Sequence, residues 1–288
     1  MRTINDVRTR FQVALNEANY TEEMELNMDF INKRSLSNEF KLVAKDLQSL
    51  EYKNELRFLI ARRYFPNLNI SEVTLPKVTS AEDLNKSLNT LYAMNPAGFT
   101  DLLEREISGL GPGEILLYFI LDNVSLGGGS SAGVDIIDGT TPYEVKAVNR
   151  TTDGKLINFK LGGTVDISGV QSRIMQLKAE LLKFNPKIKE GEKTGINNDH
   201  IKGFADKKFQ KHAKSLGLDM FEDLEKEFQD IAYNGYFKNH PIIFLGNKAA
   251  SKAEKGRIYN IIQVTKNQVG MYKVTSSTIK PFIDPTKK

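Results

Sequence analysis

Three charged residues lie within otherwise apolar, strand-like segments near the middle of the chain. Asp135 is in the run VDII, and Glu144 and Lys146 are two positions apart in the run YEVKAV. Residues i and i+2 of a strand point to the same face of a sheet. Charged side chains among Val, Ile and Ala cost free energy unless a counter-charge or a bound ion offsets that cost. These three residues are therefore the first candidates for chemistry.

Turn-forming residues at 138–141 separate the two runs and predict an antiparallel hairpin. A four-residue loop pairs Ile137 with Pro142 and sets Asp135 directly opposite Glu144. A two-residue turn slips the pairing by two positions but keeps both carboxylates on one face. A five-residue loop separates them unless a bulge intervenes, because a slip of one residue reverses the face of every side chain. The predicted site therefore depends on the hairpin register.

Two carboxylates on neighbouring strands repel each other unless a cation or a shared proton lies between them. Oxygen ligands with open coordination positions suit a hard ion such as Mg²⁺ or Mn²⁺. Glu114, at the start of a predicted helix over 112–123, could add a third carboxylate. Lys146, one step beyond Glu144 on the same face, would supply a positive charge near a bound water. Together these residue types predict a site for metal-assisted phosphodiester hydrolysis.

The spacing of these residues resembles the motif of the PD-(D/E)XK nuclease superfamily, which includes restriction endonucleases, phage exonucleases and junction resolvases. Asp135 is followed nine positions later by Glu144-Val145-Lys146, and Glu114 lies on an upstream helix. Val134 stands where the family name has proline, a position that varies widely in the family. The resemblance covers about residues 110–265 and implies a restriction-endonuclease-like core of helix, three strands, helix and strand.

The resemblance also implies a role for each residue of the motif. Asp135 and Glu144 are expected to bind one or two Mg²⁺ or Mn²⁺ ions, with the backbone carbonyl of Val145 completing the shell. Glu114 matches the helix glutamate that ligates the metal directly or through water in many members. Lys146 is expected to orient or help deprotonate the attacking water and to stabilise charge on the phosphate.

Candidate DNA contacts are polar or basic residues outside this motif. Gln171, on the helix predicted over 168–184, is similar to a Gln or Lys found near the metal site in some branches of the family. The two residues just past the second strand, and the basic residues of a later loop, could contact the phosphate backbone, although surface solvation explains them equally well. These candidates are Gln171, Asn149, Arg150, Lys248, Lys252 and Arg257.

The order of elements predicts a mixed α/β (α+β) fold, with a small mixed sheet flanked by helices. Residues 1–108 are expected to form a helical accessory region, and 109–288 the nuclease domain with a helical insertion at about 185–235. Helices are predicted over 35–65, 81–93, 97–107, 112–123, 168–184 and parts of 203–234, and strands over 134–137, 143–148, 156–163, 241–246, 256–264 and 271–275.

The composition narrows the classes of protein. The 288 residues include no Cys, which excludes disulfides, thiolate zinc sites and cysteine nucleophiles. No apolar run approaches the ~20 residues of a membrane-spanning helix. A cytoplasmic protein is expected, or one in a host cytoplasm or virion if it is phage-encoded. Residues 200–288 carry 16 Lys and Arg against 9 Asp and Glu, which indicates either a phosphate-facing patch or a lysine-rich solvated surface.

The leading hypothesis is a Mg²⁺-dependent deoxyribonuclease of the restriction, phage DNA-processing or branched-DNA type, with DNA as its partner and no membrane association. The alternative is a non-catalytic DNA-binding or structural virion component built on the same fold. A homodimer or larger assembly through the N-terminal helices fits either reading. A third possibility is that Asp135, Glu144 and Lys146 form a surface ion cluster on an unrelated α/β enzyme.

Overall fold

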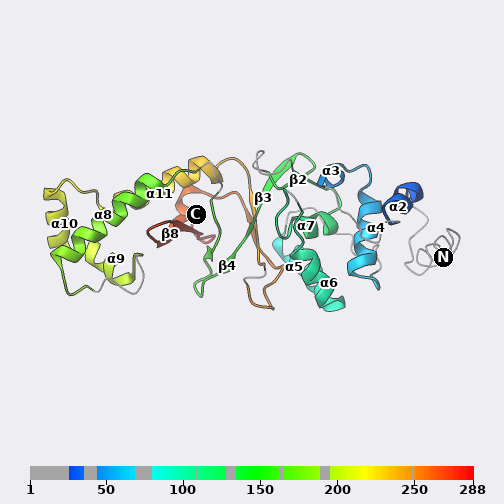
Figure 1. The fold of residues 1–288 in the computed structure, drawn as a ribbon, viewed down its shortest axis with the longest axis horizontal. Coiled ribbons are helices and arrows are strands. Elements are labelled where there is room, and N and C mark those ends of the chain that lie inside the picture. Colours follow the sequence, from blue (N-terminus) through cyan, green and yellow to red (C-terminus); the bar gives the residue numbers. More distant parts are fainter. Residues whose placement is uncertain are drawn as a thin grey trace. The chain divides into compact units, whose positions relative to one another are not determined.

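The protein has a mixed α/β structure, which confirms the predicted class (Figure 1). The chain forms two compact units, Met1–Ala147 with Ile243–Ile261 and Val148–Ile242 with Ile262–Lys288. A computed structural model describes residues 26–35, 44–68, 80–107, 109–127, 134–161, 165–188, 195–247 and 250–288.

The first unit combines helices from the N-terminal part of the chain with a five-stranded sheet. Its described helices are α2 (Met28–Ser35), α3 (Ala44–Leu47), α4 (Lys53–Tyr64), α5 (Ala81–Met94), α6 (Pro96–Leu103) and α7 (Glu114–Ile120). The strands of the sheet, in their spatial order, are β1 (Val124–Leu126), β2 (Ile136–Asp138), β3 (Thr141–Ala147), β6 (Ile242–Leu245) and β7 (Ile258–Ile262).

The hairpin formed by β2 and β3 has the first of the predicted registers. Ile137 pairs with Pro142, and the last pair before the turn is Asp138 with Thr141. Gly139 lies in the turn with φ of +60°, a backbone conformation that glycine adopts without strain. β1 adds a third antiparallel strand beside β2. The register predicted for a four-residue loop is therefore confirmed from Ile136–Tyr143 to Asp138–Thr141. Asp135 departs from it, because its N–H donates to the carbonyl of Tyr143, the partner of Ile136.

Helix α7 is the central support of the first unit. All of its residues, EILLYFI, are buried. It begins after Gly113, whose φ is +89° and where a Cβ would lie only 2.2 Å from Cδ2 of Leu245. Glycine at this position therefore lets the helix start directly against β6. No helix in the described part of the chain has the length and apolar composition needed to cross a membrane.

The predicted division of the chain at 108/109 does not coincide with the two units. Helices α4 and α6 pack against each other, and α6 packs on α7. Phe65, just after α4, stacks on Phe119 of α7 with ring centroids 5.7 Å apart. The apolar side chains of these helices and of the sheet form one core. The described helices before residue 108 are therefore structural parts of the unit that carries the predicted site.

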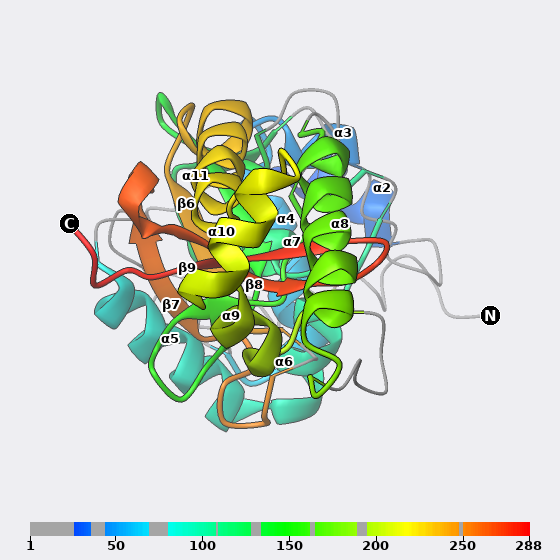
Figure 2. The same cartoon turned by 90° about the vertical axis from the view of Figure 1, so that its left-hand side faces the viewer.

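The second unit contains a four-stranded sheet and a group of helices (Figure 2). The sheet has the order β4 (Asn149–Arg150), β5 (Leu156–Ile157), β9 (Ile279–Ile283) and β8 (Val269–Val274). The other elements are α8 (Ser168–Phe184), α9 (Asn198–Phe204), α10 (Lys207–Ser215), α11 (Phe221–Ala232), the π-helix η2 (Tyr233–Phe237) and the 3₁₀ helix η3 (Lys266–Gln268). Helix α11 packs on β8 and on α8. The helix predicted over 168–184 is confirmed at both ends.

Two predicted elements were wrong in extent. The strand expected over 156–163 ends at Ile157, because Asn158 adopts a φ of +64° and turns the chain; this short strand joins the second unit's sheet instead of the sheet that holds β3. The single helix expected over 35–65 is interrupted at 48–52, where Ser49 Oγ accepts the backbone N–H of Glu51. Residues 36–43 of the predicted range lie outside the described residues.

Candidate active site

The β2–β3 hairpin holds the carboxylate of Asp135 against the backbone of β3. The backbone N–H of Asp135 donates to the carbonyl of Tyr143 at 3.0 Å. Its Oδ2 accepts the backbone N–H of Val145 at 2.7 Å. The carboxylate of Asp135 thus acts as the acceptor that a backbone carbonyl would otherwise provide. It is held beside Val145, the residue that follows Glu144 in β3.

Glu144 and Lys146 form an ion pair along one face of β3. The side chain of Glu144 is 8% exposed and that of Lys146 is 21% exposed. The i, i+2 spacing in a strand brings both side chains to the same face, as the sequence predicted. The ammonium group of Lys146 is thus the more accessible end of the pair.

Glu114, on the first turn of α7, completes the group. Its Oε1 accepts the backbone N–H of Gly111 at 2.8 Å, and the residue is only 7% exposed. Burial, together with the nearby charges of Asp135 and Glu144, raises the pKa of this carboxyl to about 8, against the opposing effects of Gly111 and Lys146. The predicted residues Glu114, Asp135, Glu144 and Lys146 therefore lie within one electrostatic environment.

The donor chemistry of this group fits a hard divalent cation. It offers three carboxylates and no sulfur or imidazole, which is the ligand type of Mg²⁺ and Mn²⁺. Within the described ranges, no three acidic or histidine side chains stand in a ready ligand arrangement. Each carboxylate instead meets a hydrogen-bond donor or cation: Gly111 N–H, Val145 N–H and Lys146. After burial, repulsion from Asp135 and Glu144 adds to the raised pKa of Glu114, and a bound cation relieves repulsion of this kind.

Val145 lies between the two charged residues of β3. The residue is buried in β3, and its N–H is the donor to Asp135. The role expected for its carbonyl, as a metal ligand, stays a prediction.

The candidate DNA contacts are distributed over both units. Asn149 and Arg150 form β4 of the second unit. Gln171, on α8 of the same unit, donates its amide N–H to the carbonyl of Thr275 at 3.0 Å. Lys252 and Arg257 are exposed in the first unit, between β6 and β7. Lys248 lies outside the described residues. DNA contact by any of these residues stays a prediction.

A second group of buried charges in the first unit was missed from the sequence. Lys53 and Arg57 lie on α4 and are each 5% exposed. Arg57 donates from Nε to the carbonyl of Phe119 at 2.7 Å and from Nη1 to Asp122 at 2.5 Å. Lys53 Nζ donates to the carbonyl of Val124. These contacts tie α4 to the end of α7 and the start of β1.

The sequence did contain a signal for this second group. Lys53 and Arg57 have i, i+4 spacing, so they share one face of α4, and the apolar residues Leu56 and Ile60 lie beside that face. Apolar and charged positions therefore do not separate into two faces. A helix whose apolar residues lie on several faces is buried on most sides. Charged residues of such a helix need hydrogen-bond or ionic partners in the protein interior.

We expect replacement of Glu114 by glutamine to change how stability depends on pH in protein without divalent ions. The folded pKa of about 8 lies above the ordinary value of 4.5. Native protein therefore keeps a proton that unfolded protein releases, and the wild type loses a few kcal/mol of unfolding free energy as pH rises from about 5 to 8. Glu114→Gln, which keeps an acceptor for Gly111, removes this loss.

Urea unfolding in EDTA at pH 5, 6.5 and 8 measures this effect. The two proteins should be similar in stability at pH 5, and the variant should be the more stable at pH 8. Parallel pH profiles for the two proteins would show that Glu114 ionises normally in the folded state.

We compared the chain with protein-family models, curated proteins and solved structures. The chain matches no protein-family model, no curated protein and no solved structure.

Proposed function

We propose that this protein is a metal-dependent DNA nuclease of the PD-(D/E)XK type, acting in restriction, phage DNA processing or cleavage of branched DNA. One observation carries the proposal: Glu114 from a helix and Asp135, Glu144 and Lys146 from a hairpin lie within one electrostatic environment. Three carboxylates beside a lysine are the groups that phosphodiester hydrolysis with a hard divalent ion requires.

The arrangement of elements supports the finer fold assignment, a restriction-endonuclease-like core. Within the first unit, helix α7 is followed by the antiparallel strands β1, β2 and β3, and β6 lies beside β3. Between β3 and β6 the chain also forms β4, β5, α8, α9, α10, α11 and η2. The helix, the three strands and the later strand of the expected core are thus present in one unit, and the expected second helix corresponds in chain order to α8 of the second unit. The three strands are not the three predicted ones, since β1 takes the place of the strand expected over 156–163.

In the proposed reaction, Mg²⁺ or Mn²⁺ when bound supplies a more acidic water and neutralises charge on the phosphate. Asp135 and Glu144 would hold the ion, with Glu114 adding the third carboxylate. Glu144 also orients Lys146 through their ion pair. The ammonium of Lys146 is then positioned to donate to a phosphate oxygen and to stabilise the charge that develops there.

A cleavage assay tests the proposed function. Linear, circular, single-stranded and branched DNA would be incubated with the wild type and with Asp135→Asn, in Mg²⁺ or Mn²⁺. We expect cleavage by the wild type and a loss of at least about 100-fold in the variant, the order of effect seen when one acid–base or charge-stabilising group is removed. Asn retains an acceptor for the N–H of Val145, so the hairpin is expected to remain folded.

Asp101→Asn is the matched control, because Asp101 is an exposed carboxylate on α6 of the same unit. It should cleave as the wild type does. Intact DNA with every substrate and both ions would contradict the proposed activity and favour the non-catalytic alternative.

A further inference from the structure

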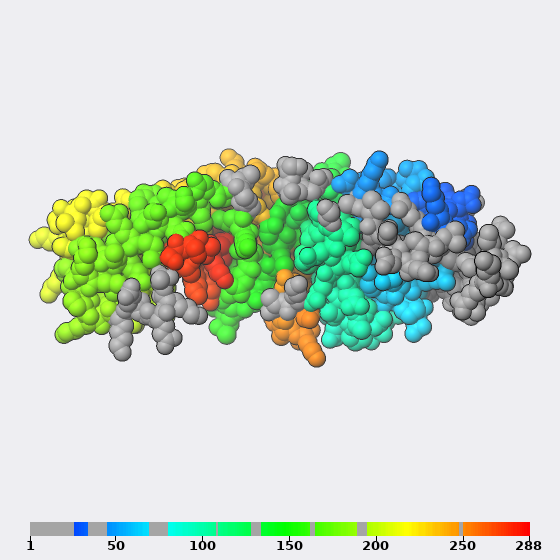
Figure 3. Space-filling model, in the orientation of Figure 1, coloured from blue at the N-terminus to red at the C-terminus, as the bar shows by residue number. Residues whose placement is uncertain are grey.

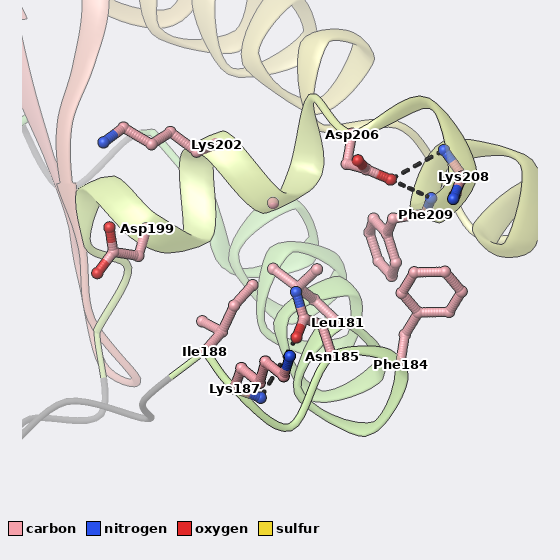
Figure 4. A pocket seen from close by; sticks show the side chains of 11 residues that line it. Leu181, Phe184, Asn185, Lys187, Ile188, Asp199, Lys202, Asp206, Lys208 and Phe209 are labelled. Atoms are coloured by element: carbon pink, nitrogen blue, oxygen red, sulfur yellow. Dashed lines mark hydrogen bonds between the residues drawn. The ribbon is translucent and has the colours of Figure 1, made fainter.

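The second unit contains an open pocket that the proposed active site does not use (Figure 4). It lies between the end of α8, α9 and the start of α10, and its volume is about 780 Å³. This volume is within the range of small-molecule sites, about 300–1,000 Å³. The residues that line it are Leu181, Phe184, Asn185, Lys187, Ile188, Asp199, Lys202, Gly203, Asp206, Lys208 and Phe209.

One wall of the pocket is aromatic. Phe184, the last residue of α8, is 41% exposed, an unusual state for a large apolar side chain. Its ring lies 5.6 Å from that of Phe209 and is stacked on His212, with centroids 4.9 Å apart. In Figure 4 the rings of Phe184 and Phe209 lie close together at one side of the pocket. The exposed ring is therefore held in place by its neighbours.

Three lysines and two aspartates also line the pocket. Lys187 follows α8, Lys202 is on α9 and Lys208 is on α10. None of the three ammonium groups forms an ion pair with another residue in the described part of the chain. Asp206 uses its carboxylate to cap α10, accepting the N–H groups of Lys208 and Phe209 at 2.9 and 3.0 Å. Asp199 is the other acid in the lining.

Helix α10, yellow in Figure 3, carries further positive charge in the second unit. Its sequence, KKFQKHAKS, contains four lysines, one histidine and no acid. Lysine side chains near a phosphate backbone gain free energy by releasing its condensed counterions. A strand that enters the pocket would therefore meet further lysines beside it.

We propose that this pocket binds an unpaired nucleotide of a DNA strand, with its base against Phe184 and its phosphates near Lys187, Lys202 and Lys208. A flat ring beside cations is complementary to a nucleotide, and stacking on an aromatic side chain accepts any base. Bases inside a duplex are already stacked on one another and cannot reach Phe184. The choice of DNA as the polymer rests on the proposed function, and the site implies a substrate with single-stranded character.

Binding in EDTA tests this inference without cleavage. Fluorescence anisotropy would give the Kd of the full-length protein for a labelled single-stranded oligonucleotide and for a blunt duplex. We expect Phe184→Leu to weaken single-strand binding by about 5- to 100-fold and to leave duplex binding unchanged. Phe184→Trp, which keeps a stacking ring, should bind at least as tightly as the wild type.

Leu216→Ala is the matched control, since Leu216 is 52% exposed at the end of α10 and does not line the pocket. It should bind as the wild type does. The double variant Lys202→Gln/Lys208→Gln should reduce the salt slope of single-strand binding by about 0.7 for each lysine that contacts a phosphate.

Two results would overturn the inference: no single-strand binding by the wild type, or equal single-strand binding by Phe184→Leu. Because no metal is present, these results are independent of the nuclease proposal. Single-strand binding that requires Phe184, in a protein that cleaves nothing, would keep this inference and contradict the proposed activity. DNA cleavage by the wild type, with single-strand binding unchanged in Phe184→Leu, would support the proposed activity and contradict this inference.

Discussion

Replacement of Lys146 by methionine is expected to lower DNA cleavage by about 100- to 10,000-fold, the range for loss of a group that assists proton transfer. Methionine keeps the apolar stem in β3 but removes the ammonium. Lys146 is the more exposed member of its ion pair with Glu144, at 21% against 8%. We therefore expect its charge to face the phosphate of a bound substrate.

The same substitution has a structural effect that must be separated from the catalytic one. Glu144 would keep its carboxylate in a buried position after losing the cation that pairs with it. Removing one partner of a buried charged hydrogen bond costs about 1–3 kcal/mol. We therefore expect Lys146→Met to be less stable than the wild type, and Glu144→Gln/Lys146→Met to recover much of this loss.

A double-mutant cycle on unfolding free energy and on cleavage rate separates the two roles. The double variant should regain stability but not activity, and Lys146→Arg, which retains the charge, should keep more activity than Lys146→Met. If the double variant cleaved DNA as the wild type does, the Glu144–Lys146 pair would be an ion cluster without a catalytic role.

The positions of the candidate residues on the hairpin and at the helix start were predictable from the sequence, because they depend on local geometry. Asp135 and Glu144 are joined by one turn, so the register of a single hairpin determines their proximity, and Ile137 pairs with Pro142 as expected. Glu114 was placed correctly at a helix start because Gly113 precedes an unbroken apolar run. Local spacing and turn chemistry were sufficient to predict which secondary-structure elements carry these residues.

The assignment of strands to sheets was not predictable in the same way, because it depends on pairings between distant segments. The sequence predicted one small mixed sheet, but β5 pairs with β9 in a second sheet, and β9 was not predicted at all. The strand β1 was missed because Val124 and Leu126 follow directly on an apolar helix and lack a separate signal of their own. In a short apolar run, periodicity does not distinguish a buried strand from a buried helix.

The environment of Lys53 was also not predictable, because it too depends on contacts between distant segments. Its burial depends on Tyr118 and Val124, which lie far along the chain, and nothing in the sequence around α4 names these partners. Its Nζ lies 3.7 Å from the centre of the Tyr118 ring and donates to the carbonyl of Val124. Burial, with the nearby charge of Arg57, lowers the pKa of Lys53 to about 6, although Asp122 and Asp138 act in the opposite direction.

We expect this buried amine to make the folded state more stable as pH rises from about 6 to 10. Unfolded protein holds the lysine proton up to its ordinary pKa of 10.5, whereas native protein releases it above about 6. The unfolded state therefore binds more protons throughout this range, and the contribution to unfolding free energy grows by up to about 1.4 kcal/mol per pH unit. At neutral pH, burying the neutral amine still costs free energy.

Lys53→Met removes this cost and keeps a side chain of similar length. At pH 7 we expect the variant to be more stable than the wild type by on the order of 3 kcal/mol, after the loss of the hydrogen bond to Val124 is included. Urea unfolding at several pH values between 6 and 9 gives the difference between the two proteins. That difference should shrink as pH rises, because the wild type approaches the state in which the amine is neutral in both forms.

Lys86→Met is the matched control, since Lys86 is exposed on α5 of the same unit, and its difference from the wild type should not depend on pH. A Lys53→Met protein that is less stable than the wild type at pH 7, with a difference that does not change with pH, would mean that Lys53 is charged in the folded state. The ammonium would then be stabilised by Asp122, Asp138 and the face of the Tyr118 ring, and the cluster would hold α4 against β1 by charge instead of by a neutral hydrogen bond.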